Sequence, residues 1–157
     1  MESSSVDILI VEDEKELGES IKMLLEAQGY RVEIASTGRE AEERIQNKKY
    51  DIAIIDLLLP DISGIDVLKS FDPRQFPRTR KIILTGHASL ESAIQALNLG
   101  ADAYLVKPVS PENMLKTIKE QLEKQSQEIA MVQEKVMMLV ERTLRERLKK
   151  LEDEKYI

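Results

Sequence analysis

Residues 51–68 read DIAIIDLLLPDISGIDVL, and this stretch decides the fold. It begins with a run of Ile and Ala that is too short for a core helix and is typical of a strand buried on both faces. Pro60 and Gly64 mark the loop after this strand, and a short helix is expected to follow them. The strand is therefore predicted at residues 51–56, and it ends on an acid, Asp56.

The same alternation of a short apolar run with an amphipathic stretch continues on both sides of this segment. Apolar residues recur at helical spacing between the runs, and Gly29 and Gly100 stand where helices should end. Strands that are each followed by a helix are typical of a parallel sheet with helices on both faces and right-handed crossovers. We therefore expect an α/β fold with a doubly wound five-stranded parallel sheet. The other strands are predicted at residues 6–11, 30–35, 81–85 and 103–106, and helices at 14–28, 36–47 and 90–99.

Composition excludes several classes of protein. The chain has 157 residues, of which 42% are hydrophobic, and this is enough for one compact domain with an extension. It contains no Cys, so a disulfide, a thiolate nucleophile and a Cys-ligated zinc are impossible. The start, MESSSVDILI, has no basic segment and no long apolar run, so we expect no signal peptide, no membrane span and a cytoplasmic protein. Residues 1–5 are expected to be disordered.

The formal net charge of −6 is distributed unevenly along the chain. Residues 111–157 contain ten basic and ten acidic side chains, so the excess negative charge lies in the first 110 residues. An acidic domain repels a phosphate backbone, and the chain has no basic stripe. Direct binding of nucleic acid is therefore not expected.

Polar side chains follow the predicted strands at the edge where a doubly wound sheet binds its ligands. Neighbouring carboxylates repel one another, and a hard divalent cation such as magnesium relieves that repulsion. An ammonium and a hydroxyl beside them can neutralise a phosphoryl group while it is transferred onto a carboxylate. The pattern therefore predicts a magnesium-dependent phosphoryl-transfer site. Its members are Glu12 and Asp13 after the first strand, Asp56 after the third, Thr85 after the fourth and Lys107 after the fifth.

Each of these residues alone has a simpler explanation. An Asp at a strand end is often only solvated or caps a helix, and the pair Lys107–Pro108 can belong to a turn. The prediction depends on the whole set occurring together and in this chain order.

Four segments of the chain strongly resemble the receiver domain of two-component response regulators: ILIVEDE at 8–14, DIAIIDLLLPDISGIDVL at 51–68, IILTGHAS at 82–89 and GADAYLVKP at 100–108. The resemblance covers about residues 6–122 and implies a flavodoxin-like fold. It implies that a sensor histidine kinase supplies a phosphoryl group to Asp56. It further implies a magnesium site made of Glu12, Asp13, Asp56 and the backbone carbonyl of Leu58, with Thr85 and Lys107 on the phosphoryl group.

The resemblance also makes Tyr104 the switch aromatic, which turns inward when Thr85 moves towards the phosphoryl group. The simpler alternative is an ordinary half-buried tyrosine on a strand. Leu58 lies two residues after the acceptor and cannot hold a hydrolytic water with its side chain, so we expect a fairly long-lived phosphoaspartate. His87 flanks the same water path in the family, although an exposed loop residue without that role is the simpler reading.

Beyond Pro111 the chain has no further Pro and no Gly, and Ser110 is placed to cap a helix that starts there. A helix of about forty residues extends roughly 60 Å, so only its first turns can pack on a small domain. An apolar 4-3 pattern predicts a coiled coil over 123–157, and we favour a parallel homodimer over a partly ordered monomeric helix. The pattern runs through Ile118, Leu122, Gln125, Ile129, Val132, Val136 and Leu139, and it restarts, as at a stutter, at Val140, Leu144, Leu148 and Leu151.

The output of such a receiver remains open. It can act on a downstream protein partner, or the chain can be the N-terminal receiver of a longer transcription factor or hybrid kinase whose output domain follows the helix. A phosphohydrolase with Asp56 as covalent nucleophile is a further alternative, but the second acid expected two residues later is Leu58. We expect a phosphoacceptor that loses its phosphoryl group slowly, and not a turnover enzyme.

Overall fold

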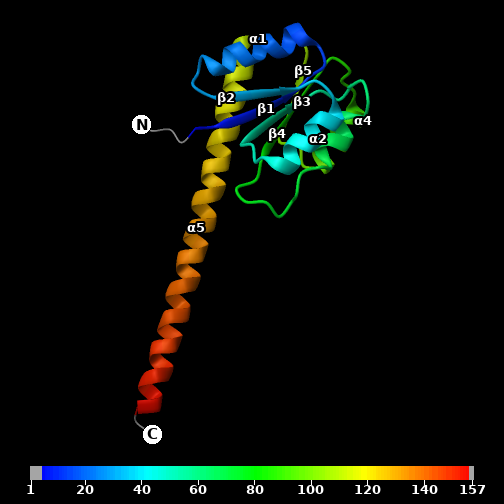
Figure 1. Cartoon of the computed structure of the whole chain (residues 1–157). Coiled ribbons are helices and arrows are strands. Elements are labelled where there is room, and N and C mark those ends of the chain that lie inside the picture. Colours follow the sequence, from blue (N-terminus) through cyan, green and yellow to red (C-terminus); the bar gives the residue numbers. More distant parts are fainter. Residues whose placement is uncertain (1–4, 156–157) are drawn as a thin grey trace. The chain divides into compact units, whose positions relative to one another are not determined.

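The computed structural model describes residues 5–155 and contains one parallel five-stranded sheet of order β2-β1-β3-β4-β5 (Figure 1). The disorder expected for residues 1–5 concerns, apart from Ser5, positions outside this range. Every strand is followed by a helix, which confirms the predicted doubly wound α/β fold. The strands are β1 Asp7–Val11, β2 Arg31–Ala35, β3 Ile52–Ile55, β4 Arg80–Thr85 and β5 Ala103–Val106.

The helices cover both faces of this sheet. Side chains of α1 and of the first turns of α5 pack in one apolar cluster, and those of α2, α3 and α4 pack in another. The sheet thus separates two cores. The helices are α1 Lys15–Glu26, α2 Gly38–Asn47, α3 Gly64–Leu68, α4 Leu90–Asn98 and α5 Pro111–Lys155.

The strand β1 shows why these segments read as continuous apolar runs. Ile8 and Ile10 point into the cluster with α1 and α5, whereas Leu9 and Val11 point into the cluster on the opposite face. All four side chains are 1% exposed or less. Successive residues of a strand face opposite sides, so a strand covered on both sides needs apolar residues at every position.

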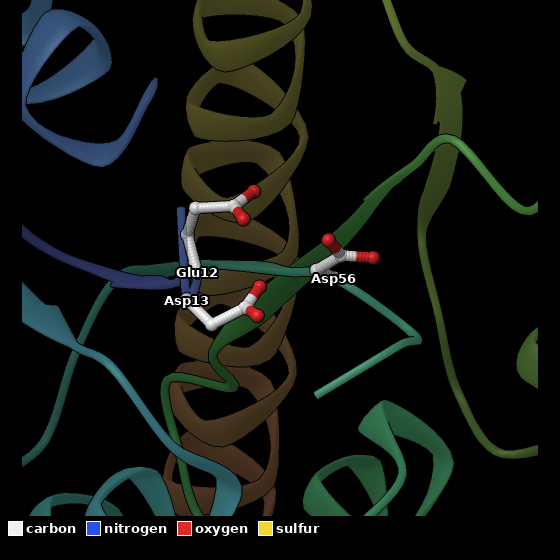
Figure 2. Close-up of side chains that lie close together, drawn as sticks. All are labelled: Glu12, Asp13 and Asp56. Atoms are coloured by element: carbon white, nitrogen blue, oxygen red, sulfur yellow. The ribbon is translucent and has the colours of Figure 1, made fainter. Parts of the chain in front are cut away.

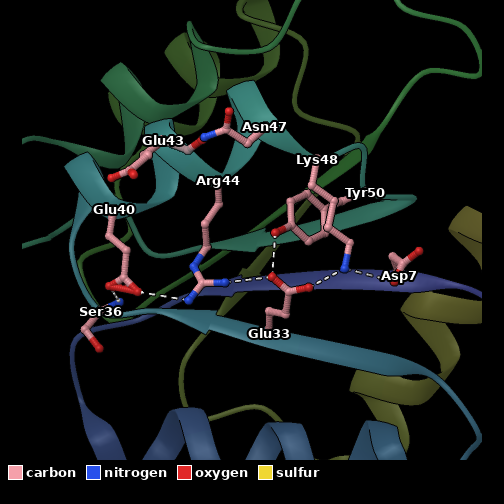
Figure 3. A network of polar contacts seen from close by, with 9 residues as sticks. All are labelled: Asp7, Glu33, Ser36, Glu40, Glu43, Arg44, Asn47, Lys48 and Tyr50. Atoms are coloured by element: carbon pink, nitrogen blue, oxygen red, sulfur yellow. Dashed lines mark hydrogen bonds and ion pairs between the residues drawn. The ribbon is translucent and has the colours of Figure 1, made fainter.

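A polar network fixes α2 to the edge of the sheet (Figure 3). Glu33 of the edge strand β2 accepts hydrogen bonds from Arg44 at 2.7 Å and from the Tyr50 hydroxyl at 2.8 Å, and it pairs with Lys48. These donors, Lys48 first among them, lower the pKa of Glu33. Burial, reinforced by the bond to Glu33, raises the pKa of Tyr50 to about 12. The carboxylate thus ties one helix, one strand and the start of β3 together.

The last helix begins as the sequence indicates. The Ser110 side chain accepts a hydrogen bond from the backbone N–H of Asn113 at 3.1 Å, and α5 then runs unbroken from Pro111 to Lys155. The chain divides into two units between Glu123 and Lys124. The first unit contains the sheet and all its covering helices, and residues 124–155 are helical throughout.

The apolar stripe of α5 is only partly exposed. Ile118 is fully buried in the core, and Gln125 is 7% exposed. From Met131 onward, in contrast, the apolar side chains of the described helix are open to solvent. No helix within residues 5–155 is long and apolar enough to cross a membrane. The exposed members include Val132, Val136, Leu139, Val140, Leu144, Leu148 and Leu151.

Candidate functional site

Three carboxylates meet at the carboxyl end of the central strands (Figure 2). The parallel pairing of Val11 with Ile55 brings the residues that follow β1 and β3 side by side. As a result, carboxylate oxygens of Glu12, Asp13 and Asp56 lie within 4.8 Å of one another. Asp13 is exposed, whereas the other two are almost completely buried.

Lys107 closes this cluster from the end of β5. Its ammonium lies 2.7 Å from Glu12 Oε1 and 2.8 Å from Asp56 Oδ2, and 3.8 Å from the more exposed Glu14. Burial favours the neutral form of both the carboxyl group and the amine. It therefore raises the pKa of Glu12, even though the hydrogen bond from Lys107 opposes the change. Burial alone would lower the pKa of Lys107, but the bonds to Asp56 and Glu12 outweigh it and the pKa is raised.

The loop after β3 holds Asp56 by its backbone. The N–H of Leu58 donates to Asp56 Oδ1 at 3.1 Å, and the N–H of Gly64 donates to the Leu57 carbonyl at 2.9 Å. A Cβ at Gly64 would lie only 2.2 Å from the Asp56 carbonyl oxygen, so this position requires glycine. Sequence reasoning treated Gly64 only as a loop signal and missed this close approach, which becomes visible only once the chain is folded.

Thr85 lies at the end of β4, next to the lysine. Its side chain is fully buried, and its hydroxyl accepts a hydrogen bond from the backbone N–H of His87 at 3.1 Å. The backbone N–H of Lys107 in turn donates to the Thr85 carbonyl at 3.0 Å. Strand pairing therefore fixes Thr85 and Lys107 at one edge of the acidic cluster.

The side chains of Leu58 and His87 flank this region at the surface. Leu58 is 55% exposed, and His87 is exposed as well. An aliphatic side chain cannot donate or accept a hydrogen bond to a water molecule. The Leu58 side chain therefore cannot hold a water at this edge, and its backbone N–H is the group that contacts Asp56.

Tyr104 is half-buried on β5 and packs against the core on the side of α4. Its hydroxyl lies 2.8 Å from the hydroxyl of Ser92 in the first turn of α4. Ser92 is a residue that sequence reasoning missed. The spacing of Ser89 and Ser92 at the start of a helix was the available signal, because serine at such positions caps helices.

The donor set suits a hard divalent cation. Magnesium prefers oxygen ligands and is held by one or two carboxylates together with water and phosphate oxygens. The buried Asp56, the exposed Asp13 and the neighbouring Glu12 offer such oxygens, and the backbone of Leu58 lies next to Asp56. A carboxylate surrounded in this way can act as the nucleophile towards a phosphoryl group.

Comparison with known proteins agrees with this geometry. The family model described as response regulator receiver domain matches residues 8–119. The alginate biosynthesis transcriptional regulatory protein AlgB of Pseudomonas aeruginosa is 37% identical over 116 residues, which are 74% of this chain and 26% of that protein. The response regulator ArlR of Staphylococcus saprophyticus is 37% identical over 120 residues, 76% of this chain and 54% of its own length. The chain thus spans about a quarter to about half of these curated relatives.

A solved receiver structure has the same fold. The crystal structure of a response regulator receiver domain protein (CheY-like) from Methanospirillum hungatei JF-1 matches with a TM-score of 0.75 and 43% sequence identity. The match covers 80% of this chain and 99% of that one. The chain therefore belongs to the response regulator receiver domain family.

Proposed function

We propose that this receiver accepts a phosphoryl group from a sensor histidine kinase onto Asp56. The observation that carries the proposal is the position of the Asp56 carboxylate. It is 5% exposed, lies 2.8 Å from the Lys107 ammonium, and shares its edge of the sheet with Glu12 and Asp13. A buried carboxylate with an ammonium and a cation-binding acidic pair beside it is arranged for phosphoryl transfer.

In this reaction a carboxylate oxygen of Asp56 attacks the phosphorus of a phosphohistidine. The new P–O bond forms while the P–N bond breaks, and the imidazole leaves with the electron pair. The Lys107 ammonium pairs with the Asp56 carboxylate at 2.8 Å and then holds an oxygen of the phosphoryl group. A magnesium ion bound by Asp13, Asp56 and the carbonyl of Leu58, with Glu12 beside it, would neutralise further charge on the phosphoryl oxygens.

Thr85 and Tyr104 convert phosphorylation of Asp56 into a conformational change. The Thr85 hydroxyl leaves the N–H of His87 and binds the phosphoryl group, and Tyr104 turns into the space that Thr85 vacates. Phosphorylation can act only by favouring one of two pre-existing states of the protein. The change reaches the surface at α4 and β5.

The helix beyond residue 123 supplies the proposed route to an output. Its exposed side chains Val132, Val136 and Leu139 continue the 4-3 pattern, which restarts at Val140, Leu144, Leu148 and Leu151. A stripe of this kind is stabilised when a second helix covers it, and a parallel homodimer is our proposal. Because the relatives AlgB and ArlR are longer and are regulatory proteins, an output domain beyond the helix is the form of output we favour.

We further propose that the chain is a phosphoacceptor with slow self-dephosphorylation and not a turnover enzyme. A phosphohydrolase of the Asp-nucleophile type uses a second acid two residues after the nucleophile. Leu58 occupies that place and cannot donate a proton to a leaving group.

The proposal is tested by incubating the full chain with magnesium and phosphoramidate, a small phosphodonor, and weighing the intact protein. We expect at most one phosphoryl group per chain in the wild type and none in Asp56→Asn. Asp72→Asn is the matched control, because it makes the same carboxylate-to-amide change at an exposed loop residue that pairs only locally with Arg74. Equal labelling of wild type and Asp56→Asn, or continuous release of phosphate from a phosphomonoester, would contradict the proposal.

A further inference from the structure

The contact between Tyr104 and α4 is formed by two hydroxyls. Tyr104 lies in the middle of β5, where it pairs with Ile83 of β4, and its ring is anchored in the core that α2, α3 and α4 cover. Its hydroxyl extends to Ser92 Oγ at 2.8 Å. The tyrosine is therefore attached to the sheet through its backbone and to α4 through its tip.

Ser92 also belongs to the cap of α4. Its backbone N–H donates to Ser89 Oγ at 3.0 Å, and its own hydroxyl oxygen accepts from the Ser89 N–H at 3.2 Å. The Ser89 carbonyl and the Ser89 hydroxyl lie at 3.1 and 3.0 Å from the same Ser92 oxygen. With Tyr104, four polar groups surround a hydroxyl that can make three hydrogen bonds, one as donor and two as acceptor.

Because Ser92 has more hydrogen-bond partners than its hydroxyl can use, Tyr104 can be released at low cost. When the tyrosine leaves, Ser92 keeps three partners in the cap and no polar group of the helix end is left unpaired. The cost of breaking the contact is therefore that of one exchangeable hydrogen bond, without a desolvation penalty for Ser92. Such a contact can shift the population between the two states of the receiver, and it can still be broken on activation.

The same cap is connected to Thr85 through a short loop. His87, which donates its N–H to the Thr85 hydroxyl, lies only two residues before Ser89. A movement of the Thr85 hydroxyl towards Asp56 removes the acceptor of His87 and frees the loop that carries the cap. Thr85 is thus linked to the Ser89–Ser92 cap through its hydrogen bond to His87 and the two chain residues that follow His87, and the cap in turn contacts Tyr104.

We infer that Ser92 is a positioning residue that holds Tyr104 against α4 in the unphosphorylated receiver and so opposes activation. The inference rests on the proposed phosphorylation of Asp56, and it adds a residue that sets the balance between the two states. Loss of the Ser92 hydroxyl should favour the activated state by the value of one hydrogen bond, which is about two- to tenfold in affinity for a phosphoryl mimic. The adjacent exposed side chains of α4, Leu90 and Ile94, lie on the surface that this balance would alter.

The test is a double-mutant cycle on the affinity of the full chain for beryllofluoride, a phosphoryl mimic, in the presence of magnesium. Ser92→Ala is expected to bind the mimic about two- to tenfold more tightly than the wild type. In a Tyr104→Phe background the same substitution should have no effect, because the hydroxyl that Ser92 holds is already gone. Ser89→Ala is the control for damage to the cap. It removes the hydroxyl that accepts from the Ser92 N–H and lies 3.0 Å from Ser92 Oγ, but it leaves the Tyr104 contact, so it should not tighten binding of the mimic as Ser92→Ala does.

A spectroscopic signature separates positioning from a merely structural role. In protein labelled with 3-fluorotyrosine, Ser92→Ala should move the fluorine resonance of Tyr104, identified by its absence in Tyr104→Phe, and Ser92→Thr should restore it. An unchanged affinity and resonance in Ser92→Ala would overturn the inference, as would an equal effect in both tyrosine backgrounds. If the wild type itself fails to bind beryllofluoride, the proposed function falls, and this result is distinct from normal binding that Ser92→Ala does not alter.

Discussion

Gly64 offers a sharp test of how the backbone positions the acceptor. In Gly64→Ala the new Cβ would lie 2.2 Å from the Asp56 carbonyl oxygen and 2.8 Å from the Leu57 Cα. Both neighbours are backbone atoms, so no side chain can rotate away, and α3 or the loop after β3 must move. Forced packing of this kind costs about 1–3 kcal/mol, and we expect a value towards the upper end.

Gly18 is the matched control. It is also buried and lies inside α1, but a Cβ there would meet its nearest neighbour, Ile34 Cδ1, at an ordinary 3.6 Å. Replacing a glycine within a helix by alanine stabilises by about 0.5–1 kcal/mol when space permits. The two single-methyl changes should therefore differ by about 2–4 kcal/mol in the free energy of unfolding.

Urea unfolding followed by far-UV circular dichroism measures both values. A displaced Asp56 should also slow phosphorylation by phosphoramidate in Gly64→Ala, whereas Gly18→Ala should react at the wild-type rate. If both variants unfold within about 0.5 kcal/mol of the wild type, the close approach of Gly64 to Asp56 does not exist and the account of this loop is wrong.

Three further predictions concern the edge network, the tail and the acceptor loop. Glu33 has a lowered pKa in the folded chain, so its stabilising effect is present above its ordinary pKa of 4.5 and is lost as the pH falls through the folded value. Glu33→Gln should lower stability by about 0.5–1 kcal/mol at neutral pH, after allowance for solvent screening, and the gap in melting temperature should close as the pH falls through the lowered pKa of Glu33. If the helix forms the proposed dimer, the wild type and Glu141→Gln should sediment as dimers and Val136→Glu as a monomer. A wild type that is already monomeric would contradict the coiled coil. Leu58→Asn, which supplies a side chain able to hold water, should shorten the life of the phosphorylated form severalfold in a mass-spectrometric time course, and an equal or longer life would remove the role given to Leu58.

The sheet could be predicted from the sequence because it is covered on both faces. In β1 and β3 every residue between the flanking polar positions is buried, so the apolar runs mark the strands directly. The exact strand ends could not be predicted from these runs: β3 is one residue shorter at each end than predicted, and β4 is one residue longer. β4 starts at Arg80, one residue before the predicted strand, and Arg80 is 5% exposed because its Nε donates to Gln121 of α5 at 3.0 Å. A charged side chain gives no apolar signal, and its partner lies far along the chain.

The members of the acidic site could also be predicted, because parallel strands bring their carboxyl ends to one edge. The contacts among these members could not. The contacts of Lys107 with Glu12 and Asp56, and the close approach of Gly64 to the Asp56 backbone, depend on atomic positions that the strand pattern does not specify. The contact between Ser92 and Tyr104 could not be predicted either, because the two residues lie on different elements, α4 and β5, and no sequence pattern links their hydroxyls.

Chemical mapping of the acyl phosphate tests the central claim most directly. Protein treated with phosphoramidate and magnesium is reduced with borohydride, which cleaves an acyl phosphate and leaves an alcohol at the modified carboxyl, and the peptides are sequenced by mass spectrometry. We predict that the reduced residue is Asp56 and that Lys107→Ala shows much less of it, because the ammonium 2.8 Å from Asp56 is lost. Reduction at Glu12 or Asp13, or no reduced residue at all, would contradict the assignment of Asp56 as the phosphoacceptor.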